Sequence, residues 1–193
     1  MDVSVFRRAA LVRDRVLVED NMDFFEVVKK RRSIRTFKDK QVEEAKLQKI
    51  LEAVNQAPSA GNLQAYEVYV IRDAERRAAL VKAALDQEFM GRAPVTLVFC
   101  THGKRAEARY GERGVQLYSV QDATIACTYA MLAATALGLS SVWVGKFDEA
   151  AVEALADVPA GQRPVAMLPI GYAGEAPQAP ARRALEDLVH VVS

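Results

Sequence analysis

The chain has 193 residues, of which 51% are hydrophobic and 26% charged, with a formal net charge of +1. This length and composition suit one folded soluble domain and exclude a largely disordered chain. The near-zero net charge gives no broad attraction to nucleic acid or to anionic membranes, so an anion site has to come from local clustering of cations.

Residues 1–21 are expected to form an N-terminal extension, because a second methionine, Met22, is followed at once by Asp23 and a helical pattern. Residues 22–193 are then a single domain. The N-terminal residues lack the continuous apolar core and the following cleavage site of a secretory signal, so a cytoplasmic location is expected. Cys100 and Cys127 lie in apolar surroundings without redox or zinc spacing, which predicts buried, reduced thiols and no metal site.

The first half of the chain predicts two helices, a strand and a third helix. Asp23 is a candidate N-cap for a helix that ends at the basic run near Arg31, and a second helix is predicted over residues 42–56, before Pro58. The alternating β-branched and aromatic segment 66–71 predicts a strand. Asp73 then caps a helix that continues to about residue 85.

The second half predicts three more strands around a long central helix. The strands are expected over residues 94–100, 141–146 and 165–170, the central helix over 115–137, and a short Asp148-capped helix to about 156. Residues 123–145 carry no charge over a length that could span a bilayer. Their Thr, Ser and Gly content and the break at Gly138 favour a buried helix followed by a strand, so no membrane insertion is expected. The alternation of strands and helices predicts a layered arrangement whose strand order stays open.

The run Lys29 to Arg35 contains five cations and the hydroxyl of Ser33. Such a group can hold a phosphate dianion through charge-assisted hydrogen bonds. The alternative is a solvated helix end, because Lys and Arg also favour helix C-termini.

Three further segments carry candidate binding groups. In the Pro58–Gln64 loop, Asn and Gln side chains offer paired donors and acceptors to a planar heterocycle, or the loop is an Asx-type turn. Backbone amides of the Val142–Phe147 segment could face a ligand beyond a strand end, or its Trp and Phe are simply core. In the tail, Arg182 and Arg183 could add charge to a phosphate or only aid solubility.

The order in which these elements occur resembles the nitroreductase family over about residues 22 to 190. The motifs that carry the resemblance are Arg-Arg-Ser-Ile-Arg-Thr-Phe, Ala-Pro-Ser-Ala-Gly-Asn-Leu-Gln, Leu-Gly-Leu-Ser-Ser-Val-Trp-Val-Gly, Leu-Pro-Ile-Gly-Tyr and an arginine in the tail. The resemblance implies an α+β fold with a mixed, mainly antiparallel sheet of four to five strands covered by helices. It also implies an intertwined homodimer, with FMN at the subunit interface and C-terminal segments that embrace the neighbouring subunit.

Carried over by position, the family's flavin contacts fall on four regions of the chain. Phosphate and ribityl contacts correspond to Arg31, Arg32, Ser33, Arg35 and Arg182. The loop contributed by the other subunit corresponds to Pro58, Ser59, Ala60, Asn62 and Gln64, with Asn62 at the isoalloxazine edge. The segment that approaches the flavin ring corresponds to Val144, Gly145 and Lys146. Some relatives have a glutamate in place of Gly145 and a Gln-Pro-Trp loop in place of Gln64-Ala65-Tyr66, departures that concern the substrate pocket.

The resemblance implies that NAD(P)H reduces FMN, which then reduces a nitroaromatic, a quinone or a similar small acceptor. The flavin carries the chemistry, so no catalytic side chain is expected. Related enzymes that fragment flavin or dehalogenate a substrate are an alternative, but the chain is compact between Thr101 and Val115, where no extra lid segment is expected. A nucleic-acid-binding role for the Lys29 to Arg35 run is less favoured, because interleaved aromatic residues are lacking.

Overall fold

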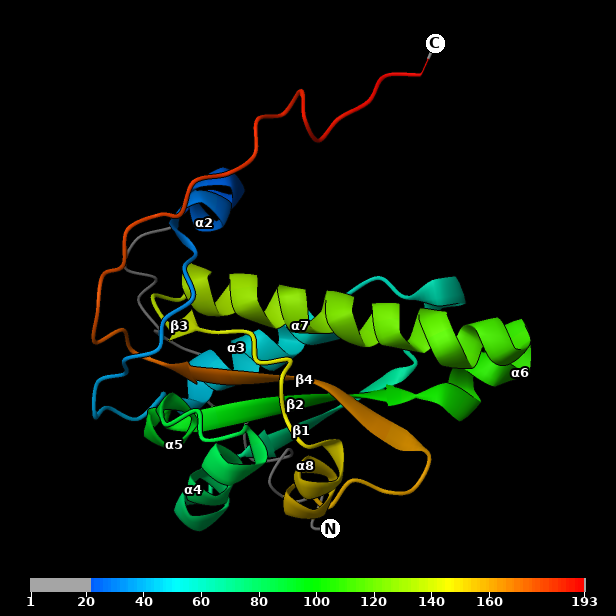
Figure 1. Cartoon of the computed structure of the whole chain (residues 1–193), viewed down its shortest axis with the longest axis horizontal. Helices are drawn as coiled ribbons and strands as arrows, with labels where there is room; N and C mark the ends of the chain where they lie inside the picture. The colour runs from blue at the N-terminus through cyan, green and yellow to red at the C-terminus, as the bar shows by residue number, and fades with distance from the viewer. Residues whose placement is uncertain (1–21, 193) are drawn as a thin grey trace.

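The computed structural model describes residues 22–192. Its four-stranded antiparallel sheet has the strand order β1-β2-β4-β3 and carries helices on both faces (Figure 1). The strands are β1 (Tyr66–Ile71), β2 (Val95–His102), β3 (Ser140–Ser141) and β4 (Gln162–Gly171). The α-helices are α2 (Phe24–Lys30), α3 (Glu44–Asn55), α4 (Ala74–Ala83), α5 (Phe89–Arg92), α6 (Gly103–Arg113), α7 (Ser119–Ala136) and α8 (Glu149–Leu155).

The predicted α+β fold is confirmed, and an isolated parallel bridge between Ser33 and Ser141 makes the pairing mixed. The predicted extension, residues 1–21, lies outside the described residues. In the part of the chain that is described, no helix is both long and apolar enough to cross a membrane.

The three predicted aspartate caps are confirmed. Each carboxylate accepts a hydrogen bond from the backbone N–H three residues later, at 2.9 Å for Asp23, 2.8 Å for Asp73 and 3.0 Å for Asp148. These bonds satisfy amide groups that have no partner within the first turn of a helix. Local sequence therefore sets where α2, α4 and α8 begin.

The core has two layers, because the side chains of β2 alternate between the two faces of the sheet. Leu97 and Phe99 pack toward α3 and α7, whereas Val98 and Cys100 pack toward α4 and α8. Four fully buried alanines of α7 allow this helix to lie close to the sheet: Ala123, Ala126, Ala130 and Ala134.

Both cysteines are buried and free, as the sequence predicts. Burial raises the pKa of the Cys100 thiol to about 12, and it also raises the pKa of the Cys127 thiol. Because a thiol reacts through its thiolate, neither cysteine is poised to act as a nucleophile at neutral pH.

The structure corrects two expectations about the elements. The predicted strand 141–146 is wrong in extent, since β3 ends at Ser141 and only Val144 returns to β4, as an isolated bridge to Met167. Its β-branched residues fit a buried surface, and such residues report burial more than ladder pairing. The second correction is α6, which fills the segment between β2 and the central helix where no element was predicted.

A π-turn over Gly114–Tyr118 joins α6 to α7. Gly114 permits the close contact of this turn with α6, because a Cβ atom there would lie 2.6 Å from the Ala106 carbonyl oxygen. The sequence of α6 is rich in charged residues and has few apolar ones, and its buried residues are Gly103 and Ala106.

Candidate cofactor-binding site

The basic segment after α2 lies against the β3 edge of the sheet. The Ile34 N–H donates to the Ser141 carbonyl oxygen at 3.1 Å, next to the Ser33–Ser141 bridge. This pairing fixes the backbone that carries Arg31, Arg32 and Ser33. Ser33 and Ile34 therefore lie on the β3 edge, whereas Lys29 and Lys30 form the last turn of α2 and Arg31 is its C-cap.

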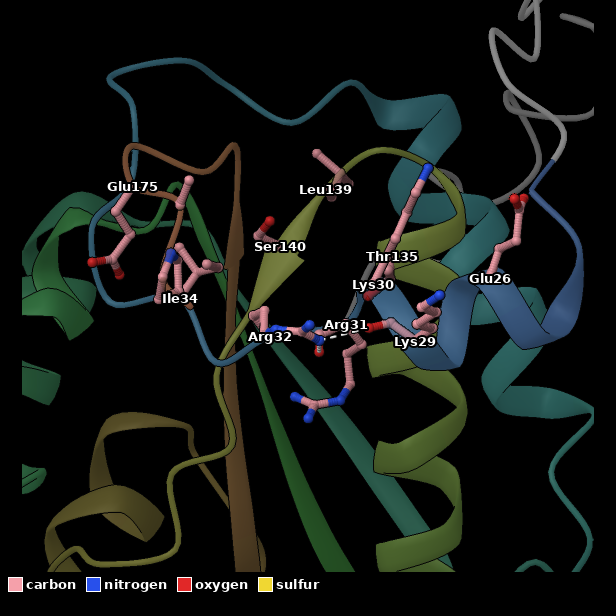
Figure 2. A pocket seen from close by; sticks show the side chains of 12 residues that line it. Glu26, Lys29, Lys30, Arg31, Arg32, Ile34, Thr135, Leu139, Ser140 and Glu175 are labelled. Atoms are coloured by element: carbon pink, nitrogen blue, oxygen red, sulfur yellow. Dashed lines mark hydrogen bonds between the residues drawn. The ribbon is translucent and has the colours of Figure 1, made fainter. Parts of the chain in front are cut away.

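A pocket of about 550 Å³ lies beside this segment (Figure 2). It falls between the end of α2, the end of α7 with β3, and the segment that follows β4. Its volume is within the range of small-molecule sites, roughly 300 to 1,000 Å³. The lining residues are Glu26, Lys29, Lys30, Arg31, Arg32, Ile34, Thr135, Leu139, Ser140, Glu175, Ala176 and Pro177.

The arginines at this pocket repel one another. Partial burial, together with the charges of Arg182 and Arg32, lowers the pKa of Arg31. Arg182 from the tail is thus close enough to act on Arg31, although the two are far apart in sequence. Within residues 22–192, none of these three arginines forms an ion pair.

Arg32 is held by its own backbone rather than by a carboxylate. Its guanidinium donates to the Lys29 carbonyl oxygen at 2.6 Å and to the Arg31 carbonyl oxygen at 2.8 Å. Guanidinium groups that lie close together and form no ion pair match the planar oxygen pairs of a phosphate. The cluster therefore fits a phosphorylated ligand such as FMN.

Glu175 is a functional candidate that sequence analysis missed. Its carboxylate accepts the N–H groups of Arg35 and Thr36 at 2.5 and 2.9 Å, and these bonds lower the pKa of Glu175. The carboxylate thus clamps the backbone of the basic segment to the chain after β4. No local pattern marks such a contact, because it joins segments 140 residues apart.

The loop over residues 58–64 has an unusual backbone. The loop contains a short 3₁₀ turn, η2 (Ala60–Asn62). In this turn the φ values of Gly61 and Asn62 are 56° and 58°, and just after it the φ value of Gln64 is 49°. The Ser59 hydroxyl accepts from the Gln64 N–H at 2.9 Å. Positive φ is uncommon outside glycine, so this conformation must be held by the surroundings.

Asp122 holds that loop from the first turn of α7. Its side chain is 2% exposed, and its two oxygens accept the N–H groups of Ala60 at 2.9 Å and Ala65 at 3.3 Å. The sequence patterns described above assign no role to Asp122. The signal for its role is that it is the only charged residue between Arg113 and Lys146.

The loop and the cationic pocket lie at opposite ends of α7. Asp122 contacts the loop near the start of this helix, and Thr135 lines the pocket at its end. At a rise of 1.5 Å per residue, these two positions are about 20 Å apart along the helix. The structure therefore does not bring Asn62 to Arg31 within one chain.

The Val144–Lys146 segment lies at the same edge of the sheet as the cationic pocket, because both pair with β4. Val144 bridges to Met167, and Ser141 pairs with Ile170, so the two positions are about 10 Å apart along β4. Gly145 and Lys146 are exposed, and their N–H groups have no acceptor among the residues that the structure describes. These free amides can donate to a planar ligand beside the pocket.

The remaining polar groups do not suggest a metal centre. In residues 22–192, no group of three or more His, Cys, Asp or Glu side chains is placed to hold an ion. The features of the site are a cationic pocket and a neighbouring pair of backbone amides that have no acceptor among the described residues.

Comparison with known proteins identifies the family. The model of the nitroreductase family matches residues 28–88 and 81–172. The NADH dehydrogenase of Thermus thermophilus is 32% identical over 187 residues, covering 83% of this chain and 91% of that protein. The oxygen-insensitive NADPH nitroreductase of Salmonella typhimurium is 30% identical over 166 residues, covering 82% and 69%.

A solved structure agrees with these sequence matches. The NADPH:FMN oxidoreductase from Vibrio harveyi, complexed with NAD+, superposes with a TM-score of 0.80 at 25% identity, covering 87% of this chain and 76% of that chain. The chain therefore belongs to the nitroreductase family, as its motifs predict.

Asp122→Asn should lower the free energy of unfolding by about 1–3 kcal/mol, because one buried loop amide loses its charged acceptor. Urea denaturation measures this loss. The matched control is Asp157→Asn, since Asp157 forms an exposed ion pair with Arg76 and its loss should cost less than about 1 kcal/mol. Equal effects of the two substitutions would show that Asp122 is not an anchor.

Proposed function

We propose that the protein is an FMN-dependent oxidoreductase that passes electrons from NAD(P)H to a nitroaromatic, a quinone or a similar acceptor. The observation that carries the proposal is the cluster of Arg31, Arg32 and Arg182, which forms no ion pair among the described residues and lies beside a pocket. The names of the relatives support it, because they describe an NADH dehydrogenase, an NADPH nitroreductase and an NADPH:FMN oxidoreductase.

The residues of the β3 edge can hold the two ends of the cofactor. We assign the phosphate and ribityl contacts to Arg31, Arg32, Ser33, Arg35 and Arg182. The free N–H groups of Gly145 and Lys146 would face the flavin ring, and Val144 fixes this segment through hydrogen bonds of 2.9 Å to Met167 in both directions. FMN, when bound, supplies the redox chemistry by accepting a hydride equivalent from the nicotinamide donor.

The protein's contribution is binding and electrostatics rather than acid–base catalysis. Backbone amides that are already oriented can stabilise negative charge that develops on a bound ring without reorganising during the reaction. The lack of a side chain at Gly145 keeps its N–H accessible, and a Cβ atom there would lie 3.3 Å from the Trp143 indole nitrogen. No ionisable side chain is needed at this position.

The proposed site is completed by a second copy of the chain. The separation of about 20 Å along α7 places Asn62 out of reach of the phosphate cluster in its own chain. We therefore propose a homodimer in which the partner supplies the loop residues. These residues are Pro58, Ser59, Ala60, Asn62 and Gln64.

Exposed apolar side chains support the homodimer. The extended tail runs past α2 and away from the sheet (Figure 1). Phe25 of α2 is 79% exposed, and Leu185 and Val191 of the tail are 72% and 91% exposed. Apolar groups gathered on a free segment are typical of an interface, and a tail that wraps a second copy would bury them.

An absorbance spectrum tests the proposal directly. The purified protein should be yellow, and its flavin bands should bleach when NADPH or NADH is added without oxygen. The flavin bands should then return when a nitroaromatic or a quinone is supplied, because the acceptor reoxidises the reduced flavin. A colourless protein that also fails to take up added FMN would contradict the function.

Arg31→Gln should weaken FMN binding by about tenfold or more, because a charge-assisted contact to the phosphate is lost. Riboflavin, which has no phosphate, should bind both proteins equally. Fluorescence titration gives both affinities. Arg183→Gln is the matched control, since the Arg183 side chain bonds to the Asp187 carbonyl oxygen in the tail. Equal losses for FMN and riboflavin would argue against a phosphate contact.

Co-expression of two defective chains tests the shared site. Arg31→Gln removes a phosphate contact, and Asn62→Gly removes the amide while allowing the left-handed backbone at φ 58°. In a mixed dimer one site receives both defects and the other neither, so about a quarter of all sites should recover wild-type FMN affinity. If both residues served the same chain's site, no site would recover.

A further inference from the structure

A linked set of aromatic and cationic side chains covers the outer end of α6 and the π-turn. The rings of Tyr110 and Tyr118 pack edge to face with centroids 5.1 Å apart. The Arg109 guanidinium lies 5.5 Å from the Tyr110 ring centroid, and the Arg113 guanidinium lies 5.4 Å from that of Tyr118. We call these four residues the α6 surface.

The α6 surface is attached to the loop over residues 58–64. The Tyr110 hydroxyl sits so close to Gly61 that a Cβ atom there would lie 2.5 Å from it. Arg109 donates to the Gly61 carbonyl oxygen at 3.5 Å, and Arg105 donates to the Gln64 carbonyl oxygen at 2.6 Å. If the loop reaches the partner's flavin, as the proposed function requires, the α6 surface lies at the outer margin of that site.

The arginines of this helix differ in how their charge is used. Arg105 is paired with Glu67 at 2.6 Å. Arg109 and Arg113 are exposed, and no carboxylate in residues 22–192 lies within ion-pair distance of either. The nearby Glu112 accepts a hydrogen bond from Gln116 at 2.7 Å. Two cations beside two aromatic rings are therefore available to a ligand.

We infer that the α6 surface binds the phosphorylated adenosine half of the electron donor and selects NADPH over NADH. An adenine ring stacks on tyrosine rings, and guanidinium groups bind a phosphate bidentately. The reacting nicotinamide must lie on the flavin, so the adenosine half of the donor extends outward, toward the margin where these residues lie. NADPH has an additional phosphate on the adenosine ribose, and this phosphate is the group that Arg109 and Arg113 would distinguish.

The test combines ligand binding with kinetics, using the full-length flavoprotein. Calorimetry with adenosine 2′,5′-bisphosphate and with 5′-AMP measures binding of the adenosine half without turnover. The double variant Arg109→Gln/Arg113→Gln should bind the bisphosphate about tenfold more weakly and raise the KM for NADPH by a similar factor. The affinity for 5′-AMP and the KM for NADH should change by less than about twofold.

Lys104→Gln is the matched control, because it removes one exposed positive charge from the same helix. The Lys104 side chain lies beside Gly161, where a Cβ atom would be 3.9 Å from Lys104 Cε. It should leave all four quantities at their wild-type values. An equal effect of Lys104→Gln would reduce the inference to a general effect of positive charge and would overturn it.

Two other results would also overturn the inference. One is a wild-type protein that uses NADPH and NADH equally, with no response to the double variant. The other is a double variant that raises the KM of an anionic acceptor and leaves bisphosphate binding intact, which would assign the α6 surface to the acceptor. A protein without bound FMN would instead contradict the proposed function, so the two failures can be told apart.

Discussion

The length of helix α7 is the constraint on which the proposed site depends. At one end of this helix the buried Asp122 carboxylate holds the 58–64 loop, and at the other end Thr135 lines the cationic pocket. A straight helix cannot bring its own two ends together. In the proposed homodimer, a ligand that contacts both regions lies between two copies of the chain, and each single chain carries half of each site.

Electrostatic strain is concentrated at one of these ends. Partial burial and the neighbouring charges of Arg32 and Arg182 disfavour the charged form of Arg31. Such a cluster opposes folding unless an anion neutralises it, and an anion that binds only the folded chain shifts the equilibrium toward that state. Glu175 forms no ion pair with these arginines, and one of its carboxylate oxygens accepts the backbone N–H groups of Arg35 and Thr36. Under the proposed function, the phosphate of FMN is the anion that would neutralise the cluster.

Much of the fold could be predicted from local sequence. Aspartate caps, alternating hydrophobicity and the residues that break helices set the limits of most elements, because these signals act within a few residues. The extent of β3 and the presence of α6 could not be predicted in this way. The first depends on which strand is available for pairing, and the second on a close packing contact at Gly114.

The candidate site was predicted less completely than the fold. The basic run and the loop were found because their residue types are distinctive, and the order of the motifs identified the family. Glu175 was missed because its partners are distant in sequence. The role of Asp122 was missed because a single carboxylate in an apolar helix shows its importance only when the amides that it holds are known.

The four buried alanines of α7 link the two ends of the helix in a further way. They set how closely the helix lies on the sheet, and the same rigid helix carries the loop anchor and one wall of the pocket. A larger side chain at any of them would lift the whole helix rather than one end. In the proposed symmetric dimer, a change in the distance between α7 and the sheet would alter both cofactor sites at once.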